Sequence, residues 1–423
     1  MRFMHIADVH LGYQQYGSKE RFNDFSAVFL YMVDQAIERE VDFLLVAGDL
    51  FEKRTVDPLA MRVAVEGFRM LREAEIPVIA VEGNHEKAHY RDQYSWVDFL
   101  DGLGYLHLLN PRFERERAIL EPYSEEGGAF VDLPDGVRVY GLKYYGASTG
   151  KVFGLFAEAL AMIDQSDVQF TIVMAHAGLE GQLPRYSGTL THNDLAPLRE
   201  QIDYLALGHI HKPYAVDDWI YNPGSAETWS IEETDWPERG YYLVDVQPGS
   251  TPNHKARLVR TPRRPFHRSR LEVDALTEPN VLYHAVRKLL QHEDSSVPRE
   301  PAAVVELTLS GILPFNRFDL DLEFIKTLVE DVWSPLVTRV QNRTTPADFE
   351  VAVDMEASRP ELERAIVREL LERDARYRAA AEEWTQVALD VKRLALEGST
   401  PETMIDHLRQ ARSELGIGAD GGQ

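Results

Sequence analysis

The chain has 423 residues, no cysteine and a formal net charge of −24 at pH 7. This length predicts two or three domains of roughly 70–250 residues, and the lack of cysteine excludes disulfides and thiolate metal ligands. Such a negative charge counts against nucleic-acid binding over most of the surface, so contact with DNA would need a local basic patch or metal-mediated phosphate contact.

The N-terminus reads as a strand and lacks the charged and apolar regions of a secretory signal. No apolar run approaches the roughly 18 residues that a membrane-spanning helix needs. We therefore expect a cytoplasmic protein without a membrane partner, and the absence of cysteine is compatible with a reducing compartment.

Strand and helix patterns alternate over residues 1–265. The expected strands are 1–7, 41–47, 76–81, 137–142, 170–175 and 204–207, with antiparallel strands at 219–221, 241–246 and 257–259. The expected helices are 25–36, 59–74, 94–103 and 152–163. This alternation predicts an α/β fold, a β-sandwich flanked by helices.

The composition changes at a stretch rich in proline and arginine near residue 265. We predict a small α+β domain over residues 266–356. Residues 357–423 form a helical region, with one apolar helical run from Leu362 to Leu394, a shorter helix from Thr400 and a frayed tail. The predicted domains are therefore 1–265, 266–356 and 357–423.

Polar side chains follow five of the predicted strands at the point where each strand ends. They are Asp8, His10, Asp49, Asn84, His85, His176, His209 and His211. Open α/β sheets hold their chemistry at the carboxyl ends of their strands, so we expect these side chains in one cleft. Gathered there without a ligand, they would bury several uncompensated polar groups at roughly a few kcal/mol each, which favours a functional site.

Asp49 is expected on a central strand, between the strands that end at His10 and at Asn84. A central carboxylate can bridge two cations, while nitrogen and oxygen ligands on either side complete each position. Two metals roughly 3.5–4 Å apart can bind both non-bridging oxygens of a phosphoryl group and activate a bridging water for in-line attack. These residues therefore predict a binuclear metallophosphoesterase.

The motifs Asp-x-His, Gly-Asp, Gly-Asn-His, a strand-end His and Gly-His-x-His occur here in the order that characterises the calcineurin-like metallophosphoesterases. The sequence further resembles the SbcD family of DNA-repair nucleases and its meiotic-recombination relatives, in the stretches 5–12, 47–51, 81–85, 207–212 and 221–225. The resemblance spans residues 1–265. Beyond it only the layout is similar: a capping, DNA-binding domain and then helices that bind the partner ATPase.

The resemblance implies a metal pair and its ligands. One ion would be held by Asp8, His10, Asp49 and His211, and the other by Asp49, Asn84, His176 and His209. The implied metal is manganese, which this mixed ligand set permits without selecting it over magnesium or another divalent ion. His85 would be the catalytic histidine that binds no metal. Glu52 stands where many members have a histidine, and Glu86 replaces the more usual aspartate.

Three functions are compatible with the sequence. The first is a manganese-dependent DNA exonuclease and endonuclease subunit, working by a two-metal mechanism with an SbcC-type coiled-coil ABC ATPase in double-strand break repair. The second is a general phosphodiesterase or phosphatase on the same scaffold. The third is a weakly active scaffold subunit. The appended regions argue against the second function, and the intact ligand set argues against the third.

Residues 255–270 contain seven Lys and Arg residues and no acid, which gives local support for DNA contact. The candidate phosphate contacts are Arg257, Arg260, Arg263, Arg264 and Arg268. A solvated strand and linker explains the same residues equally well.

The resemblance also implies a homodimer that pairs helices 59–74 and 94–103, where core packing is the alternative interpretation. Residues 358–415 are expected to dock on the ATPase through amphipathic helices, with Leu370 and Trp384 as anchors. The alternative is a helical hairpin folded back on the capping domain.

Overall fold

The computed structural model describes residues 1–88, 94–183, 187–346, 359–373, 376–397 and 399–415. By its internal contacts the chain divides into two compact units, which are Met1–Ser269, Leu290–Leu307 and Val329–Arg339, and Arg270–Leu289, Thr308–Leu328 and Val340–Gln423. The first change of unit lies close to the predicted boundary at 265, but residues 266–356 are shared between the units. The predicted boundary at 356–357 and the predicted frayed tail, 416–423, lie outside the described residues. The three-domain division therefore stays a prediction.

Two six-stranded sheets form the centre of the first unit. One has the order β16-β15-β1-β2-β3-β4, made of β1 (Arg2–Ile6), β2 (Phe43–Val46), β3 (Val78–Ala80), β4 (His107–Leu108), β15 (Gly240–Val246) and β16 (His254–Arg260). The other has the order β13-β14-β12-β9-β8-β7, made of β7 (Phe130–Leu133), β8 (Val137–Leu142), β9 (Phe170–Ala175), β12 (Tyr204–Leu207), β13 (Tyr214–Val216) and β14 (Ile220–Asn222). Their inner faces share one buried core that includes Phe3, Phe43, Ile172 and Tyr204.

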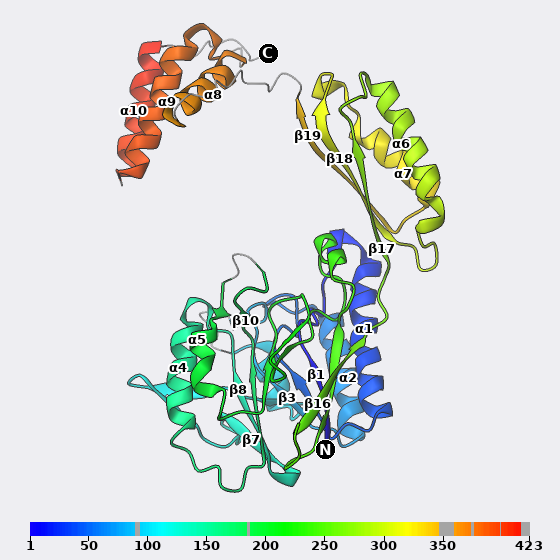
Figure 1. Ribbon diagram of the computed structural model, residues 1–423, viewed down its shortest axis with the longest axis vertical. Coiled ribbons are helices and arrows are strands. Elements are labelled where there is room, and N and C mark those ends of the chain that lie inside the picture. The colour runs from blue at the N-terminus through cyan, green and yellow to red at the C-terminus, as the bar shows by residue number, and fades with distance from the viewer. Residues whose placement is uncertain (89–93, 184–186, 347–358, 374–375, 398, 416–423) are drawn as a thin grey trace. The chain divides into compact units, whose positions relative to one another are not determined.

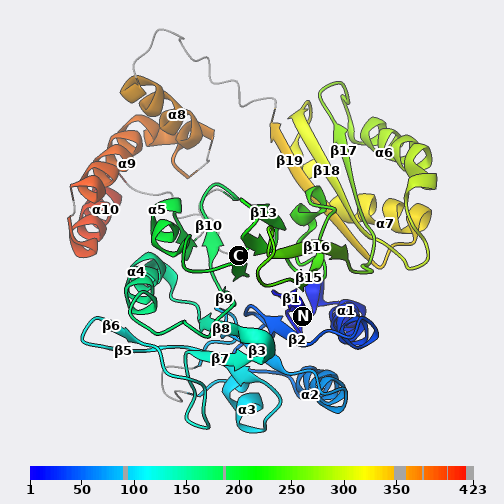
Figure 2. The ribbon, with the colours of Figure 1, turned by 60° about the horizontal axis from the view of Figure 1, so that its bottom comes forward.

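Helices cover the outer face of each sheet (Figure 1). Buried side chains of α1 (Lys19–Glu38), α2 (Pro58–Glu73) and α3 (Trp96–Gly102) share a core with β1, β2 and β3. Side chains of α4 (Thr149–Leu160) and α5 (His192–Leu195) share another with β8, β9 and β12. Figure 2 shows the same layering from a second direction. The predicted α/β class, a β-sandwich flanked by helices, is confirmed.

Residues in β1, β2, β9 and β12 are almost all buried, which explains why these strands read as continuous apolar runs. The pairs β1–β2 and β2–β3 are parallel, and β15 and β16 close the sheet in antiparallel fashion as predicted. The prediction of an antiparallel strand at 219–221 is confirmed on one side only, because β14 is antiparallel to β13 but parallel to β12. Strand β13 is the edge strand of the sheet that contains β12, and it lies next to β14.

Smaller sheets join β5 (Arg112–Glu114) to β6 (Arg117–Ile119) and β10 (Gly178–Leu179) to β11 (Thr189–Leu190). Strands β17 (Phe266–Glu272), β18 (Val304–Leu313) and β19 (Val337–Pro346) form a three-stranded sheet in that order. Helices α6 (Pro279–Glu293) and α7 (Leu322–Trp333) connect them, so the described part of 266–346 has the predicted α+β pattern.

Three C-terminal helices follow: α8 (Arg359–Arg373), α9 (Ala381–Leu396) and α10 (Pro401–Leu415). The prediction of one run from Leu362 to Leu394 was wrong, because α8 and α9 are separate. The ring of Tyr377, in the connection, packs edge-on against Trp384 with the ring centroids 5.3 Å apart. Trp384 is only 7% exposed whereas Leu370 is 47% exposed, so Trp384 stabilises the helices and is not an exposed anchor. Among the described residues, no helix combines the length and apolar character needed to cross a membrane.

Candidate metal centre

All eight strand-end residues named above lie at the carboxyl ends of five strands. Asp8 and His10 follow β1, Asp49 follows β2, Asn84 and His85 follow β3, His176 follows β9, and His209 and His211 follow β12. Strand β2 lies between β1 and β3, so Asp49 has the central position that was predicted. The two sheets therefore contribute to one cluster, whose contacts are described below.

The backbone at this cluster is unusual. Asp8, His10 and Asp49 have φ values of 50°, 52° and 52°, a left-handed conformation that costs a non-glycine residue about 1–3 kcal/mol. The glycines of the motifs are required for space: a Cβ on Gly83 would lie 2.1 Å from Asp49 Oδ1, and one on Gly48 would lie 2.3 Å from His176 Nδ1. The strain and the close packing both indicate that the surrounding fold holds these side chains in place.

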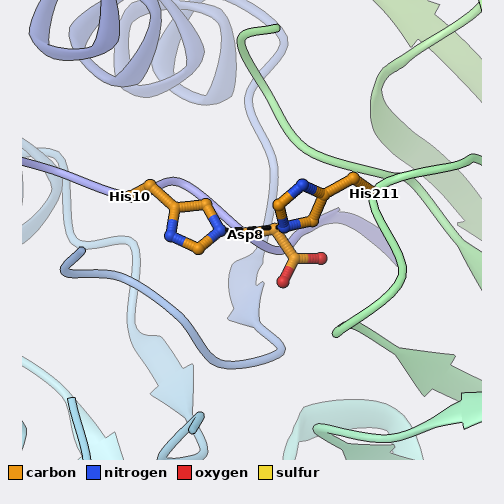
Figure 3. Close-up of side chains that lie close together, drawn as sticks. All are labelled: Asp8, His10 and His211. Carbon is orange, nitrogen blue, oxygen red and sulfur yellow. Dashed lines mark hydrogen bonds between the residues drawn. The ribbon is translucent and has the colours of Figure 1, made fainter. Parts of the chain in front are cut away.

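One group of possible ligands comprises Asp8, His10 and His211, whose ligand atoms all lie within 4.8 Å of one another. Figure 3 shows the two imidazole rings directed at each other beside the Asp8 carboxylate, with Nε2 of His10 3.0 Å from Nε2 of His211. Both Asp8 oxygens also accept from the backbone N–H of His209, at 3.0 Å. Two ring nitrogens this close must share a proton or a cation.

A second group comprises Asp8, Asp49 and His176, and a third comprises His10, Glu52 and His85. Oδ2 of Asp49 lies 3.3 Å from Nε2 of His176, and Oδ1 of Asp49 accepts from the backbone N–H of His85 at 2.9 Å. Oδ1 of Asn84 lies 3.1 Å from His176 Nε2 and 2.8 Å from His209 Nδ1. The carboxylates of Asp8 and Asp49 thus connect the histidines of the two sheets.

The histidines are fixed through their other ring nitrogens. Nδ1 of His176 donates to the carbonyl of Ala47 at 2.8 Å, and Nε2 of His209 is 2.7 Å from the carbonyl of Ser187. Nδ1 of His85 is 2.8 Å from the carbonyl of Glu52. Such contacts select the tautomer and leave the opposite nitrogen to face the cluster or the solvent.

The charges in the cluster are strongly coupled. Burial alone would raise the pKa of Asp49, but His176, His10 and His85 outweigh burial and lower it. Burial would lower the pKa of His176, yet Asp49 and Asp8 raise it to about 9. Burial and the neighbouring His176 lower the pKa of His209 to about 4. The negative charge of Asp49 and the positive charge of protonated His176 therefore favour each other, and a divalent cation can replace that proton.

The donors fit a divalent metal. Imidazole, carboxylate and amide groups are suitable ligands for manganese, iron or zinc. In addition, the buried Nδ1 of His10 lies 3.0 Å from Oε2 of Glu52 but not in the orientation of a hydrogen bond. Nε2 of His10 thus faces a ring nitrogen of His211, and Nδ1 faces the carboxylate of Glu52. Either contact is stabilised when a proton or a cation lies between the two groups.

The two positions that depart from the family pattern have clear contacts. The carboxylate of Glu86 is buried and accepts from the backbone N–H groups of Phe51, at 2.8 Å, and Gly83, at 3.0 Å. Burial and the nearby Asp49 raise the pKa of Glu86 to about 8. Glu52 accepts from the indole N–H of Trp229 at 3.0 Å. Glu86 therefore connects the loops that follow β2 and β3 through its hydrogen bonds. The carboxylate of Glu52 lies beside His10.

Sequence reasoning missed Glu233 and Trp229. Oε1 of Glu233 accepts from Nδ1 of His211 at 2.7 Å, and the Trp229 ring centroid lies 5.4 Å from that of His211. Burial would raise the pKa of Glu233, but His211 and Arg239 hold it at about 2. Neither residue belongs to a strand-end motif, so the sequence carried no local signal for them; in the structure the Ser225 hydroxyl, from the stretch 221–225, lies 3.3 Å from Glu233 Oε2.

The five arginines predicted for nucleic-acid contact do not belong to this cluster. Arg264 forms a two-fold ion pair with Asp24, and Arg268 and Arg260 pair with Asp235 and Glu238. Arg263 donates to the carbonyl of Pro237 at 2.6 Å, and burial lowers its pKa to about 10. Arg257, on β16, is exposed.

The calcineurin-like phosphoesterase family matches residues 1–213 of the chain. A DNA double-strand break repair protein Mre11 from Archaeoglobus fulgidus is 34% identical over 247 residues, which cover 55% of this chain and 52% of that protein. The protein of the same name from Methanococcus maripaludis is 45% identical over 256 residues, covering 58% and 63%.

The uncharacterized metallophosphoesterase YhaO from Bacillus subtilis is 28% identical over 264 residues, covering 59% of this chain and 58% of that protein. The chain thus spans about half to two thirds of the length of these three curated relatives. Among solved structures, the calcineurin-like phosphoesterase YfkN from Bacillus subtilis aligns with a TM-score of 0.37 and 16% identity, covering 61% of this chain and 89% of that chain.

Proposed function

Because the chain belongs to the calcineurin-like phosphoesterase family, we propose that its strand-end cluster holds two divalent metal ions and hydrolyses phosphodiester bonds of DNA. The observation that carries this proposal is the convergence of carboxylate and imidazole groups in sets of three, within each of which the ligand atoms lie within 4.8 Å of one another. Two of the relatives bear the name of a DNA double-strand break repair protein, which supports DNA as the substrate. The protein would act in the cytoplasm as a manganese-dependent exonuclease and endonuclease subunit.

In this proposal one ion is held by Asp8, His10, Asp49 and His211, and the other by Asp49, Asn84, His176 and His209. Two features support the division: the facing Nε2 atoms of His10 and His211, and the contacts of Asp49 with residues of both sheets. When bound, the ions supply positive charge to the phosphate oxygens and lower the pKa of a water molecule.

His85 is the proposed catalytic residue. Because Nδ1 of its ring faces the carbonyl of Glu52, Nε2 is left for the substrate, and 28% of the side chain is exposed. Nε2 lies 3.9 Å from Asp49 Oδ2, close enough to the cluster to reach a phosphate bound there. When protonated, Nε2 can donate to a phosphate oxygen or to the leaving oxygen.

The proposal includes two protein partners. Helices α8, α9 and α10 would dock an SbcC-type ABC ATPase through exposed apolar residues such as Ile366, Leu370 and Leu408. A homodimer would form through α2 and α3, because Leu59, Trp96, Phe99 and Leu103 are 38–48% exposed.

For DNA contact, Arg257 is the best-supported candidate, since Arg260, Arg263, Arg264 and Arg268 are already engaged by protein groups.

A second candidate function is a general phosphodiesterase. It is favoured by the similarity to YhaO, a protein described only as a metallophosphoesterase, and by the net charge of −24, which repels nucleic acid.

A cleavage assay separates the candidates. The purified protein is given manganese and either end-labelled duplex DNA, a DNA hairpin or bis-p-nitrophenyl phosphate, with EDTA as the metal-free control. We expect manganese-dependent cleavage of all three. Hydrolysis of the small diester alone would support the general phosphodiesterase, and no hydrolysis by metal-loaded protein would contradict both.

A further inference from the structure

Glu233 has more hydrogen-bond partners than an ordinary surface glutamate. Its side chain is 5% exposed, and Oε1 accepts from Nδ1 of His211 at 2.7 Å. Oε2 accepts from the backbone N–H of Trp229 at 3.0 Å, from the Ser225 hydroxyl at 3.3 Å and from the guanidinium of Arg239. A buried carboxylate with this many donors has one orientation, which is directed at His211.

Arg239 makes the position of Glu233 still more rigid. Its side chain is fully buried, Nη2 donates to the backbone carbonyl of Glu233 at 2.7 Å, and Nη1 donates to the Ser225 hydroxyl at 2.8 Å. Arg239 thus donates hydrogen bonds to both the side chain and the backbone carbonyl of Glu233. Its positive charge allows the carboxylate to remain buried as an anion.

The contact with Glu233 determines how His211 presents its ring. A carboxylate that accepts from Nδ1 requires the proton on that nitrogen, so in the neutral ring Nε2 carries a lone pair. Nε2 is the atom that faces Nε2 of His10 at 3.0 Å (Figure 3). A carboxylate on the outer nitrogen of a metal-bound histidine also makes the inner nitrogen a stronger ligand.

A second carboxylate, that of Glu52, lies beside the outer nitrogen of His10, although it is not oriented for a hydrogen bond with it. Oε2 of Glu52 lies 3.0 Å from Nδ1 of His10 and accepts from the indole N–H of Trp229 at 3.0 Å. Trp229 therefore donates to both carboxylates, through its backbone N–H to Glu233 and through its ring N–H to Glu52. Its own carbonyl accepts from the buried Gln15 at 2.6 Å, which fixes Trp229 in turn.

We propose that Glu233 is a positioning residue that acts through His211 to set the affinity of one metal position, and that Glu52, whose carboxylate lies 3.0 Å from Nδ1 of His10, supports the same position through its negative charge. Trp229 donates hydrogen bonds to both carboxylates and so fixes the positions of Glu52 and Glu233 relative to each other. This inference rests on the proposed metal site and adds residues that the strand-end motifs do not contain.

The test uses the full-length chain and the variants Glu233→Gln and Glu52→Gln, which keep the size of the side chain and remove its charge. Glu232→Gln is the matched control, because Glu232 is exposed and its carboxylate contacts Ser230. Manganese binding is measured by calorimetric titration. We expect each of the two variants to weaken one of the two sites by about 10–100-fold, to leave the other site unchanged, and the control to bind as the wild type does.

A second measurement needs no metal. In metal-free protein labelled with ¹⁵N-histidine, we expect the His211 signal to show the Nδ1 proton in the wild type and a mixture of tautomers in Glu233→Gln. If Glu233 served only to neutralise Arg239, the variant would lose thermal stability while the tautomer and the manganese affinity stayed unchanged, and the inference would be overturned.

The outcomes also separate this inference from the proposed function. Wild-type protein that binds no manganese contradicts both. Wild-type protein that binds two ions, with Glu52→Gln and Glu233→Gln equal to it in affinity, overturns the positioning roles alone. If Glu233→Gln does not fold, the wild-type spectrum decides: an Nε2 proton on neutral His211 would contradict the proposed arrangement.

Discussion

His85 differs from its neighbouring histidines in the atom that it leaves free. Nε2 of His176 faces Asp49 and Asn84 inside the cluster. Nδ1 of His85 faces the carbonyl of Glu52, and its Nε2 lies 3.9 Å from Asp49 Oδ2 on a side chain that is 28% exposed. At the scale of single residues, this difference supports the proposed role of His85 in proton transfer to the substrate, while His85 also forms a candidate ligand group with His10 and Glu52.

We therefore predict that His85→Gln keeps both metal ions and DNA binding but lowers the cleavage rate by about 10²–10⁴-fold. Glu52→Gln should have a much smaller effect on cleavage at saturating manganese, because a carboxylate beside two cations stays ionised and is a poor acid. His192→Gln, an exposed histidine of α5, is the control. Single-turnover rates on labelled duplex, with metal content measured in parallel, check this assignment. Strong cleavage by His85→Gln together with inactive, metal-loaded Glu52→Gln would refute it.

Gly83 shows how closely the backbone approaches the cluster. A Cβ at this position would lie 2.1 Å from Oδ1 and 2.3 Å from the backbone nitrogen of Asp49. Gly83→Ala should therefore displace Asp49, lower the melting temperature and reduce the bound metal. Gly154→Ala is the matched control, because nothing lies within 4 Å of its Cβ position in α4, and alanine should be neutral or stabilise the helix by up to about 1 kcal/mol. Thermal denaturation and metal analysis test the pair, and Gly83→Ala with a full metal complement would contradict the prediction.

At the scale of elements, the strand ends were predictable because each has a local signature. The run 41–47 is apolar and ends at Gly48-Asp49, and the run 76–81 ends just before Gly83-Asn84. The same short stretch of sequence therefore predicts both the strand and the candidate ligand that follows it. Glu233 has no such signature. It follows Glu232 in a short 3₁₀ segment, Ile231–Asp235, and only the fold brings it to His211, 22 positions earlier.

The break between α8 and α9 was also not predictable from spacing alone. Apolar residues continue at helical intervals from Leu362 to Leu394, and the sequence pattern does not reveal that the chain folds back. The evidence for separate helices is tertiary: Arg364, on α8, pairs with Glu382, on α9, at 2.6 Å. The burial of Trp384 results from this pairing of helices.

Helices α2 and α3 carry the predicted dimer interface. Leu59, Phe99 and Leu103 are 47%, 38% and 48% exposed, more apolar surface than the sandwich core uses. We predict a dimer at micromolar concentration that Leu103→Asp converts to a monomer, because a buried unpaired charge is costly. Met162→Asp, at a side chain that is 87% exposed, is the control. Sedimentation velocity is the measurement, and a monomeric wild type would count decisively against the interface.

At the scale of the whole molecule, charge limits how DNA can be bound. The chain carries a net charge of −24, and Arg264 and Arg268, from its basic stretch, pair with Asp24 and Asp235. Because these arginines are paired with protein carboxylates, the proposed binding of DNA would depend largely on the proposed metal ions for attraction to phosphate.

The C-terminal helices should bind the ATPase without taking part in hydrolysis. Leu370→Glu, at a residue that is 47% exposed on α8, is predicted to weaken the complex with an SbcC-type ATPase while hydrolysis of bis-p-nitrophenyl phosphate stays at the wild-type rate. Phe318→Ser is the control, because Phe318 is 95% exposed and lies outside these helices. Binding measured by interferometry tests this, and an unchanged affinity of Leu370→Glu would argue against α8 as the docking surface.

The metal content of purified variants tests the binuclear site most directly. Asp49 contacts His176 and the backbone of His85, and it lies between the two strands that supply the remaining ligands of the first sheet. By mass spectrometry of manganese-loaded protein, we predict two ions per chain in the wild type, almost none in Asp49→Ala, and one in His10→Ala. Two ions retained in Asp49→Ala would contradict the shared ligand and the site built around it.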